Sequence, residues 1–293
     1  MKNSGFRKND YAASVAFIAY SSSVAITPIC LIKLMEELSF SMAGGGGIEA
    51  VRTVLVVVVL LLSGFAAARW GKSRILIVGS LLLAVGMGAY ALAPAYIVVL
   101  SAMVFVGLGG GIVEGLVNPL VQDTHPEDSG KYLNIVNAFW SIGVLSSVLI
   151  SGMLLTRGVS WRYLMAGSSV LGLLSALLLY AFREKKPAAT SQNEAANTRQ
   201  TGTAETWRLT KEILKTKRFR AFAAAMFTGA GAEATFTFWS ASYLQIHFQT
   251  LPRAGGFGTA FFAAGMIAGR MLSGHYVKQE NLRTLILVSA TAG

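Results

Sequence analysis

The chain has 293 residues, of which 54% are hydrophobic and 13% are charged, whereas soluble domains average about 45–50% and about 25%. This composition excludes an ordinary soluble domain and indicates a protein with several membrane-spanning helices. The net charge of +11 would suit a nucleic-acid-binding protein, but most Lys and Arg residues fall in the N-terminus and in loops predicted to lie on one side. That distribution follows the positive-inside rule. It predicts a cytoplasmic N-terminus and gives no reason to expect nucleic acid.

Six long apolar segments are predicted to span the membrane in the first part of the chain, each near the ~20 residues that a spanning helix needs. The first, about residues 11–34, is expected to break or bend near Pro28, and Cys30 in it is expected to be inert packing. Its polar residues Tyr20, Ser23 and Thr27 follow helical spacing. They either line a cavity or bond to carbonyls of their own helix. The other five segments are expected over about 45–68, 75–92, 95–121, 132–155 and 161–182.

The fourth segment carries glycines four residues apart, at Gly107, Gly111 and Gly115. Glycines at this spacing form a face that a neighbouring helix can approach closely. The segment ends in residues 122–128, which contain Asp, His and Glu side chains. We expect an exposed acidic loop there rather than a metal site.

A polar stretch over residues 183–218 separates the first six helices from a second hydrophobic region. Residues 206–217 within it are expected to form an amphipathic helix on the membrane surface. Further helices are predicted over about 219–244 and 255–276, and residues 284–293 begin another. Residues 271–274 repeat the pattern of 61–64, which indicates two related halves. The predicted domains are a six-helix half (1–182), a cytoplasmic linker (183–218) and an incomplete second half (219–293).

Four charged residues are predicted to lie within the membrane, where burying one costs about 2.5–3.5 kcal/mol on insertion scales. Arg52 is expected to pair with Glu49 or to reach an internal acid. Glu114 has Asn118 one helical turn away, so both can face the same space. Glu114 is either a proton carrier or substrate ligand, or one partner of a structural ion pair. The other two are Glu233 and Arg270, and Arg270 is expected in a cytoplasmic gate or packing contact.

Two further helices carry polar and aromatic side chains that would suit a polyhydroxylated ligand, because rings cover its C–H faces and polar groups bind its hydroxyls. In the seventh helix, residues with hydroxyl groups recur along the face that carries Glu233. The alternative interpretation is that this face makes hydrogen bonds to a neighbouring helix. The fifth helix carries a stripe of amides beside aromatic rings. The predicted binding residues in these two helices are Asn134, Asn137, Trp140, Glu233, Trp239 and Tyr243.

The loop over residues 64–74 resembles the signature Gly-x-x-x-Asp-Arg-x-Gly-Arg-Arg of the major facilitator superfamily. The resemblance implies an all-α membrane bundle of two six-helix halves, here with the second half incomplete. Ala68 stands where the signature has aspartate, so the charge network that normally locks the outward-facing state is weakened or supplied otherwise. The residues implied to act in gating are Gly64, Arg69, Gly71, Lys72 and Arg74.

Within this superfamily, the fourth, fifth and seventh helices are similar to the fucose/glucose:proton symporter branch. The resemblance implies a sugar-like substrate and proton coupling, with Glu114 as the candidate carrier. The branch's membrane-embedded aspartate in helix 1 falls at Val24, so coupling through that position is absent. The residues that carry the resemblance are Glu114, Asn118, Pro119, Leu133, Asn134, Ala138, Phe139, Glu233, Trp239, Tyr243 and Leu244.

The sequence therefore predicts a secondary active transporter that works by alternating access on a small polar solute, with proton coupling. We expect a monomer in the inner cell membrane, with the lipid bilayer, solute and protons as its partners and with no cofactor or metal. Drug or metabolite efflux is the alternative within transporters, and a non-transporting membrane sensor is the alternative outside them. An enzyme is not expected, because the three histidines fall in loops or at a helix end.

Overall fold

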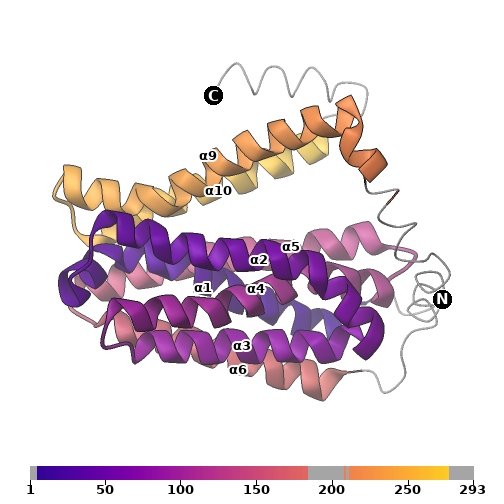
Figure 1. Cartoon of the computed structure of the whole chain (residues 1–293), viewed down its shortest axis with the longest axis horizontal. Helices are drawn as coiled ribbons and strands as arrows, with labels where there is room; N and C mark the ends of the chain where they lie inside the picture. The colour runs from indigo at the N-terminus through magenta and orange to yellow at the C-terminus, as the bar shows by residue number, and fades with distance from the viewer. Residues whose placement is uncertain (1–4, 184–207, 209–210, 277–293) are drawn as a thin grey trace.

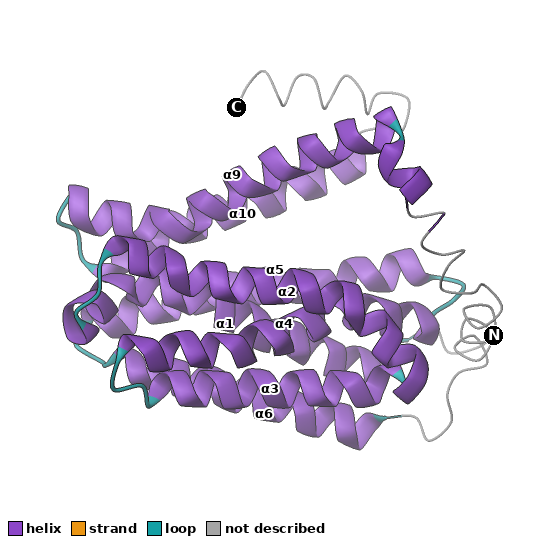
Figure 2. Ribbon diagram, viewed as in Figure 1, coloured by secondary structure: helices purple, strands orange, loops and turns teal. Residues whose placement is uncertain are grey.

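The structure, a computed structural model, describes residues 5–183, 208 and 211–276. Throughout these residues the regular elements are α-helices joined by short connections (Figure 2). The long helices are α1 (Lys8–Leu38), α2 (Met42–Trp70), α3 (Lys72–Ala91), α4 (Tyr96–Thr124), α5 (Ser129–Thr156), α6 (Trp161–Phe182), α9 (Lys217–His247) and α10 (Pro252–Tyr276).

Helix α1 is the central element of the six-helix bundle formed by α1–α6. It packs against α4, α5 and α6, while α4 also packs against α2 and α3. The helix continues through Pro28 without interruption, so of the predicted break or bend there, the break is wrong. Cys30 is fully buried, as expected of a packing residue. Because α1 touches so many neighbours, its polar side chains can meet groups from several helices.

The helix ends follow ordinary capping chemistry. Ser41, Ser160 and Thr216 precede α2, α6 and α9, and each side-chain oxygen accepts a hydrogen bond from a backbone N–H of the first turn. Between α2 and α3 the chain turns at Gly71, whose φ of +91° is a conformation that side chains rarely adopt. The predicted hairpin between two apolar helices is therefore present, and Gly71 is required by its geometry.

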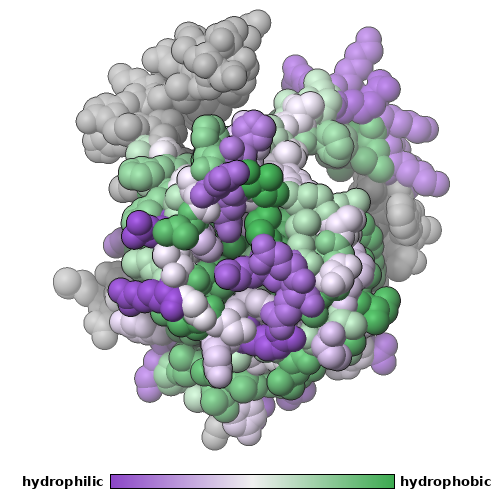
Figure 3. Space-filling model, turned by 90° about the vertical axis from the view of Figure 1, so that its left-hand side faces the viewer, coloured by the Kyte–Doolittle hydropathy of each residue, from purple (hydrophilic) through white to green (hydrophobic). Residues whose placement is uncertain are grey.

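Six helices among the described residues, α1–α6, are long and apolar enough to cross a membrane. Large apolar side chains of α2 are exposed, including Val54, Leu61 and Phe65, as expected for a helix with a face toward lipid. Hydrophilic side chains gather at the end of the bundle opposite the N-terminus (Figure 3). This arrangement matches a bundle whose sides face hydrocarbon and whose ends face water.

Helices α9 and α10 lie side by side and meet the six-helix bundle at the end opposite the N-terminus (Figure 1). There α10 packs on α5 and α9 packs on α1, and toward the N-terminal end the two helices diverge from the bundle. Of the predicted amphipathic segment 206–217, residues 211–215 are helical and exposed. The ninth helix predicted from residue 284 lies outside the described residues. Any part of the predicted repeat that follows residue 276 also lies outside them.

Candidate functional site

The centre of the candidate site is a hydrogen bond between α1 and α4. The Tyr20 hydroxyl donates to Glu114 Oε2 at 2.7 Å. Tyr20 is 3% exposed, and its ring packs against Gly110, where an added Cβ would lie 2.5 Å from ring atom Cε2. Glu114 lies one turn beyond Gly110 and is itself exposed. A buried phenol thus holds a carboxylate that faces out of the bundle's core.

The glycines of α4 create the close packing on which this geometry depends. A Cβ at Gly107 would lie 2.8 Å from the Arg52 carbonyl oxygen, and one at Gly111 would lie 2.7 Å from the Val56 carbonyl oxygen. The predicted close approach along the glycine face is therefore confirmed, and the helix that uses it is α2.

Two amides and one indole extend the site along α4 and α5. The Asn137 side chain donates to Asn118 Oδ1 at 3.1 Å and to the Leu133 carbonyl at 2.8 Å. The half-buried Trp140 ring lies 5.1 Å from the Tyr20 ring, measured between centroids. Asn134 is exposed on the same helix. The structure thus gives two groups of contacting side chains, Tyr20 with Glu114 and Trp140, and Asn118 with Asn137, and both groups include residues of α4 and α5.

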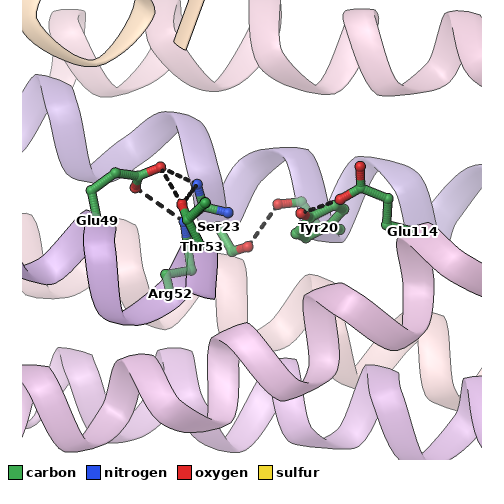
Figure 4. Close-up of polar contacts among 6 residues, drawn as sticks. All are labelled: Tyr20, Ser23, Glu49, Arg52, Thr53 and Glu114. Atoms are coloured by element: carbon green, nitrogen blue, oxygen red, sulfur yellow. Dashed lines mark hydrogen bonds and ion pairs between the residues drawn. The ribbon is translucent and has the colours of Figure 1, made fainter. Parts of the chain in front are cut away.

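Arg52 has the pairing predicted for it. Its guanidinium is bound by Glu49, one turn earlier on α2, and the Arg52 Nε to Glu49 Oε2 distance is 3.1 Å. Thr53 donates to the same carboxylate at 3.1 Å. Arg52 is 8% exposed and lies near the Tyr20 phenol. Figure 4 shows the result, a row of polar side chains from Glu49 through Arg52 and Tyr20 to Glu114.

The polar residues in the stripe of α1 are predicted either to line a cavity or to bond to carbonyls of their own helix, and they do not all behave in the same way. Tyr20 addresses another helix through Glu114, whereas the Ser23 hydroxyl donates back to the Tyr20 carbonyl at 2.6 Å. Thr27 is buried. Cavity lining therefore does not describe the stripe as a whole, and Tyr20 is the member that belongs to the site.

The candidates on α9 are less tightly gathered. Trp239 lies next to Gly46 of α2, whose added Cβ would be 3.7 Å from the indole. Tyr243 is exposed and stacks on His247 with 4.9 Å between centroids. Glu233 is exposed on the stretch of α9 that precedes these residues. Trp239 thus touches the six-helix bundle, while Tyr243 packs at the end of its own helix.

The predicted gating loop has one ion pair that the sequence did not reveal. Lys72 lies 2.9 Å from Asp123 at the end of α4. Arg69 lies over the ring of Trp70, 5.4 Å from its centroid, and Arg74 is exposed. Gly64 has open space around its Cα. The Arg270 side chain lies outside the described residues.

The prediction of an exposed acidic loop over residues 122–128 is wrong for its first part, because α4 continues to Thr124 and both Thr124 and His125 are buried. The His125 imidazole Nε2 lies 2.7 Å from Asp10 Oδ2, and the exposed fractions are 5% for His125 and 0% for Asp10. The sequence separates the pair by 115 positions, so no local pattern reveals it. The turn signal of Pro126 and the neighbouring acids favoured a solvated loop, but packing of α1 beside α4 buries the histidine.

A model described as Major Facilitator Superfamily matches residues 12–293. The MFS-type transporter ucsD of Acremonium sp is 25% identical over 197 residues, which cover 66% of this chain and 33% of that protein. The Hexuronate transporter of Bacillus subtilis (strain 168) is 26% identical over 192 residues, which cover 65% and 45%. The chain spans less than half the length of these curated relatives.

Solved structures share the fold at low sequence identity. A D-xylose-proton symporter superimposes with a TM-score of 0.63 at 14% identity, covering 88% of this chain and 65% of that one. A partially occluded, inward-open structure of the xylose transporter XylE from E. coli gives a TM-score of 0.66 at 13% identity, covering 93% and 74%. The matched family and these neighbours are transporters rather than enzymes.

Proposed function

Because the chain belongs to the Major Facilitator Superfamily, we propose that it works in the proton-coupled transport of a small, polyhydroxylated solute. In this proposal α1–α6 form one half of the transporter, residues 183–218 connect the halves, and α9 and α10 begin the second half. The positive-inside distribution of Lys and Arg supports a cytoplasmic N-terminal end. The solute moves by alternating access through the space between the halves.

The hydrogen bond between Tyr20 and Glu114 is the observation that carries the proposal. An ionised carboxylate facing lipid is costly, so an exposed glutamate in the middle of a spanning helix is expected to face the water-filled space between the halves. Tyr20 donates to this carboxylate and holds it in place. When Glu114 takes up a proton its charge is lost, and closing the site around it costs less.

The surrounding groups support a sugar-like solute. Trp140 offers an aromatic ring to a C–H face, and the Asn118–Asn137 pair offers amide donors and acceptors for hydroxyl groups. Two relatives have names that point the same way, a hexuronate transporter and a D-xylose-proton symporter. Both names refer to a sugar or a sugar acid.

The test is solute uptake by the purified full-length protein in proteoliposomes. The panel contains neutral aldoses, hexuronates and lipophilic cations, each with and without an inwardly directed proton gradient. We expect the gradient to drive accumulation of one of the sugar classes. Glu114→Gln should reduce accumulation to the level of empty vesicles while leaving exchange of solute across the membrane intact.

Glu36→Gln is the matched control, because Glu36 is an exposed glutamate at the far end of α1. It should transport as the unaltered protein does. Uptake that ignores both the proton gradient and Glu114→Gln would overturn proton coupling, and transport of lipophilic cations alone would favour efflux instead.

A further inference from the structure

A second polar link joins α1 to α4 near the N-terminal end of the bundle. His125 Nε2 and Asp10 Oδ2 lie 2.7 Å apart, and both side chains are almost completely buried. Buried charged or polar groups without partners are costly, so a contact of this kind strongly favours one relative position of the two helices. The Tyr20–Glu114 hydrogen bond makes the same connection farther along.

Each member of the pair is itself held in place. The backbone N–H of Arg7 donates to Asp10 Oδ2 at 2.6 Å, which fixes the carboxylate at the first turn of α1. The His125 ring stacks on Tyr132 of α5 with 3.6 Å between centroids and 9° between planes. We call these three side chains, Asp10, His125 and Tyr132, the latch. It joins α1, α4 and α5.

Of the charged groups around the latch, Lys131 lies over its Tyr132 ring, and the others are engaged elsewhere or exposed. Lys72 pairs with Asp123, and Lys8 lies over the Phe182 ring. Glu127 and Asp128 are exposed in the loop before α5. The carboxylate of Asp10 is therefore the acidic group in direct contact with the His125 ring.

The spacing of the two links matches along both helices. Tyr20 follows Asp10 by ten residues on α1, and His125 follows Glu114 by eleven on α4. At a rise of about 1.5 Å per residue, the links are about 15 Å apart on α1 and about 16 Å apart on α4. The two helices are antiparallel and rigid. A contact that fixes their relative position at Asp10 and His125 therefore also keeps Tyr20 opposite Glu114.

We propose that Asp10 and His125 are positioning residues for Glu114, an inference that rests on the proposed role of Glu114 in transport. The latch fixes how far α1 can slide or rotate against α4, and so keeps the Tyr20 hydroxyl within reach of the carboxylate. Without the latch, the Tyr20–Glu114 hydrogen bond loosens. Glu114 then loses the donor that holds its carboxylate in place.

Labelling with dicyclohexylcarbodiimide tests this, because the reagent modifies protonated carboxyl groups in apolar surroundings and mass spectrometry locates the adduct. The protein is labelled at neutral pH in proteoliposomes, and the Glu114 adduct is quantified. Tyr20→Phe removes the donor directly and should raise the adduct several-fold, because the phenol then no longer engages the carboxyl group. Asp10→Ala and His125→Ala should each raise it in the same direction.

The exchange Asp10→His with His125→Asp restores a pair of the same two groups and should return the adduct toward its original level. Glu127→Gln is the matched control, because Glu127 is exposed in the loop between α4 and α5 at the same end of the bundle. It should leave the adduct unchanged. If an alanine variant fails to fold, Asp10→Asn replaces it, since the amide keeps the shape and removes the charge.

An unchanged adduct in the folded latch variants, beside a raised adduct in Tyr20→Phe, would overturn the proposal. An unchanged Glu114 adduct in Tyr20→Phe would also overturn the proposal. The measurement requires no transport, so its failure is distinguishable from a failure of the proposed function. If labelling responds as expected but uptake ignores Glu114, the latch positions Glu114 and the transport role of Glu114 is wrong.

Discussion

Gly110 lies so close to Tyr20 that a Cβ on α4 at this position would be 2.5 Å from ring atom Cε2. The missing side chain is what allows the phenol to stay buried while its hydroxyl reaches Glu114 at 2.7 Å. The position of the proposed proton site thus depends on a residue that takes no part in its chemistry.

We expect Gly110→Ala to destabilise the protein by about 1–3 kcal/mol, the usual cost of adding a methyl group to a filled core. The Tyr20 ring must move away from α4, so the hydrogen bond to Glu114 should lengthen as well. Unfolding in detergent micelles titrated with SDS measures the first effect. The dicyclohexylcarbodiimide adduct on Glu114 measures the second, and it should increase.

Gly167→Ala in α6 is the matched control, because an added Cβ there has no neighbour within 4 Å. Its stability should stay the same or rise by up to about 1 kcal/mol, since alanine is the better helix former. Equal losses in the two variants would show that the Gly110 contact with Tyr20 is not what limits substitution.

A second prediction concerns the Glu49–Arg52 pair, in which the two partners are unequally buried. The exposed fraction of the side chain is 10% for Arg52 and 28% for Glu49. Glu49→Gln leaves a buried guanidinium without its anion. We expect a loss of about 2 kcal/mol, below the 3–5 kcal/mol seen for fully buried pairs because water reaches Glu49.

Arg52→Gln should cost less, since the remaining carboxylate of Glu49 can be hydrated. The double variant Glu49→Gln with Arg52→Gln should recover part of the stability that Glu49→Gln loses. Free energies of unfolding for the four proteins form a double-mutant cycle. Additive losses would indicate that the two side chains do not stabilise one another.

The sequence was sufficient for the helices and for the local part of the site. Long apolar segments separated by short polar ones placed α1–α6 to within a few residues, because a membrane leaves few alternatives to such helices. Spacing along one helix predicted that Arg52 would pair with Glu49, and the glycines of α4 predicted a close helix neighbour. Each of these depends on residues at most a few turns apart.

Contacts between helices that are far apart in the sequence could not be predicted from local patterns in the same way. Nothing in the sequence near Tyr20 indicates that its partner is Glu114, and the local pattern around His125 predicts a solvated loop although the residue is buried against Asp10. Pro28 predicts a break or a bend in α1, and the helix is continuous there. In each case tertiary contacts decide between local alternatives that the sequence leaves open.

A third prediction uses the amide pair of α4 and α5. If Asn118 and Asn137 bind solute hydroxyls together, Asn118→Leu should weaken apparent solute affinity by about tenfold, the cost of about one lost hydrogen bond with an unpaired polar group remaining. Asn137→Leu should do the same, and the double variant should lose little more. Concentration dependence of solute exchange in proteoliposomes gives the affinities.

Gln122→Leu, an exposed amide one turn beyond Asn118 on α4, is the control and should leave affinity unchanged. Fully additive effects of Asn118→Leu and Asn137→Leu would argue against a shared binding role for the pair.

The last prediction concerns the contact between α5 and α10, where the two halves meet. A Cβ at Gly256 would lie 2.6 Å from the Val148 carbonyl oxygen, and one at Gly152 would lie 3.0 Å from the Pro252 carbonyl oxygen. The backbone N–H of Arg253 also donates to the Thr156 hydroxyl at 3.0 Å. Backbones this close leave no room for a side chain, so Gly256→Leu should force α10 away from α5.

Cysteines introduced at positions 156 and 253 report this separation, because the single native cysteine, Cys30, is buried. A short bifunctional maleimide should link them efficiently in the otherwise unaltered protein and much less in Gly256→Leu. Gly265→Leu on the same helix is the control, since an added Cβ there meets nothing within 4 Å, and it should link normally. Undiminished linking in Gly256→Leu would mean that the glycine contact does not hold α10 against α5, because the helices would then stay together despite a side chain between their backbones.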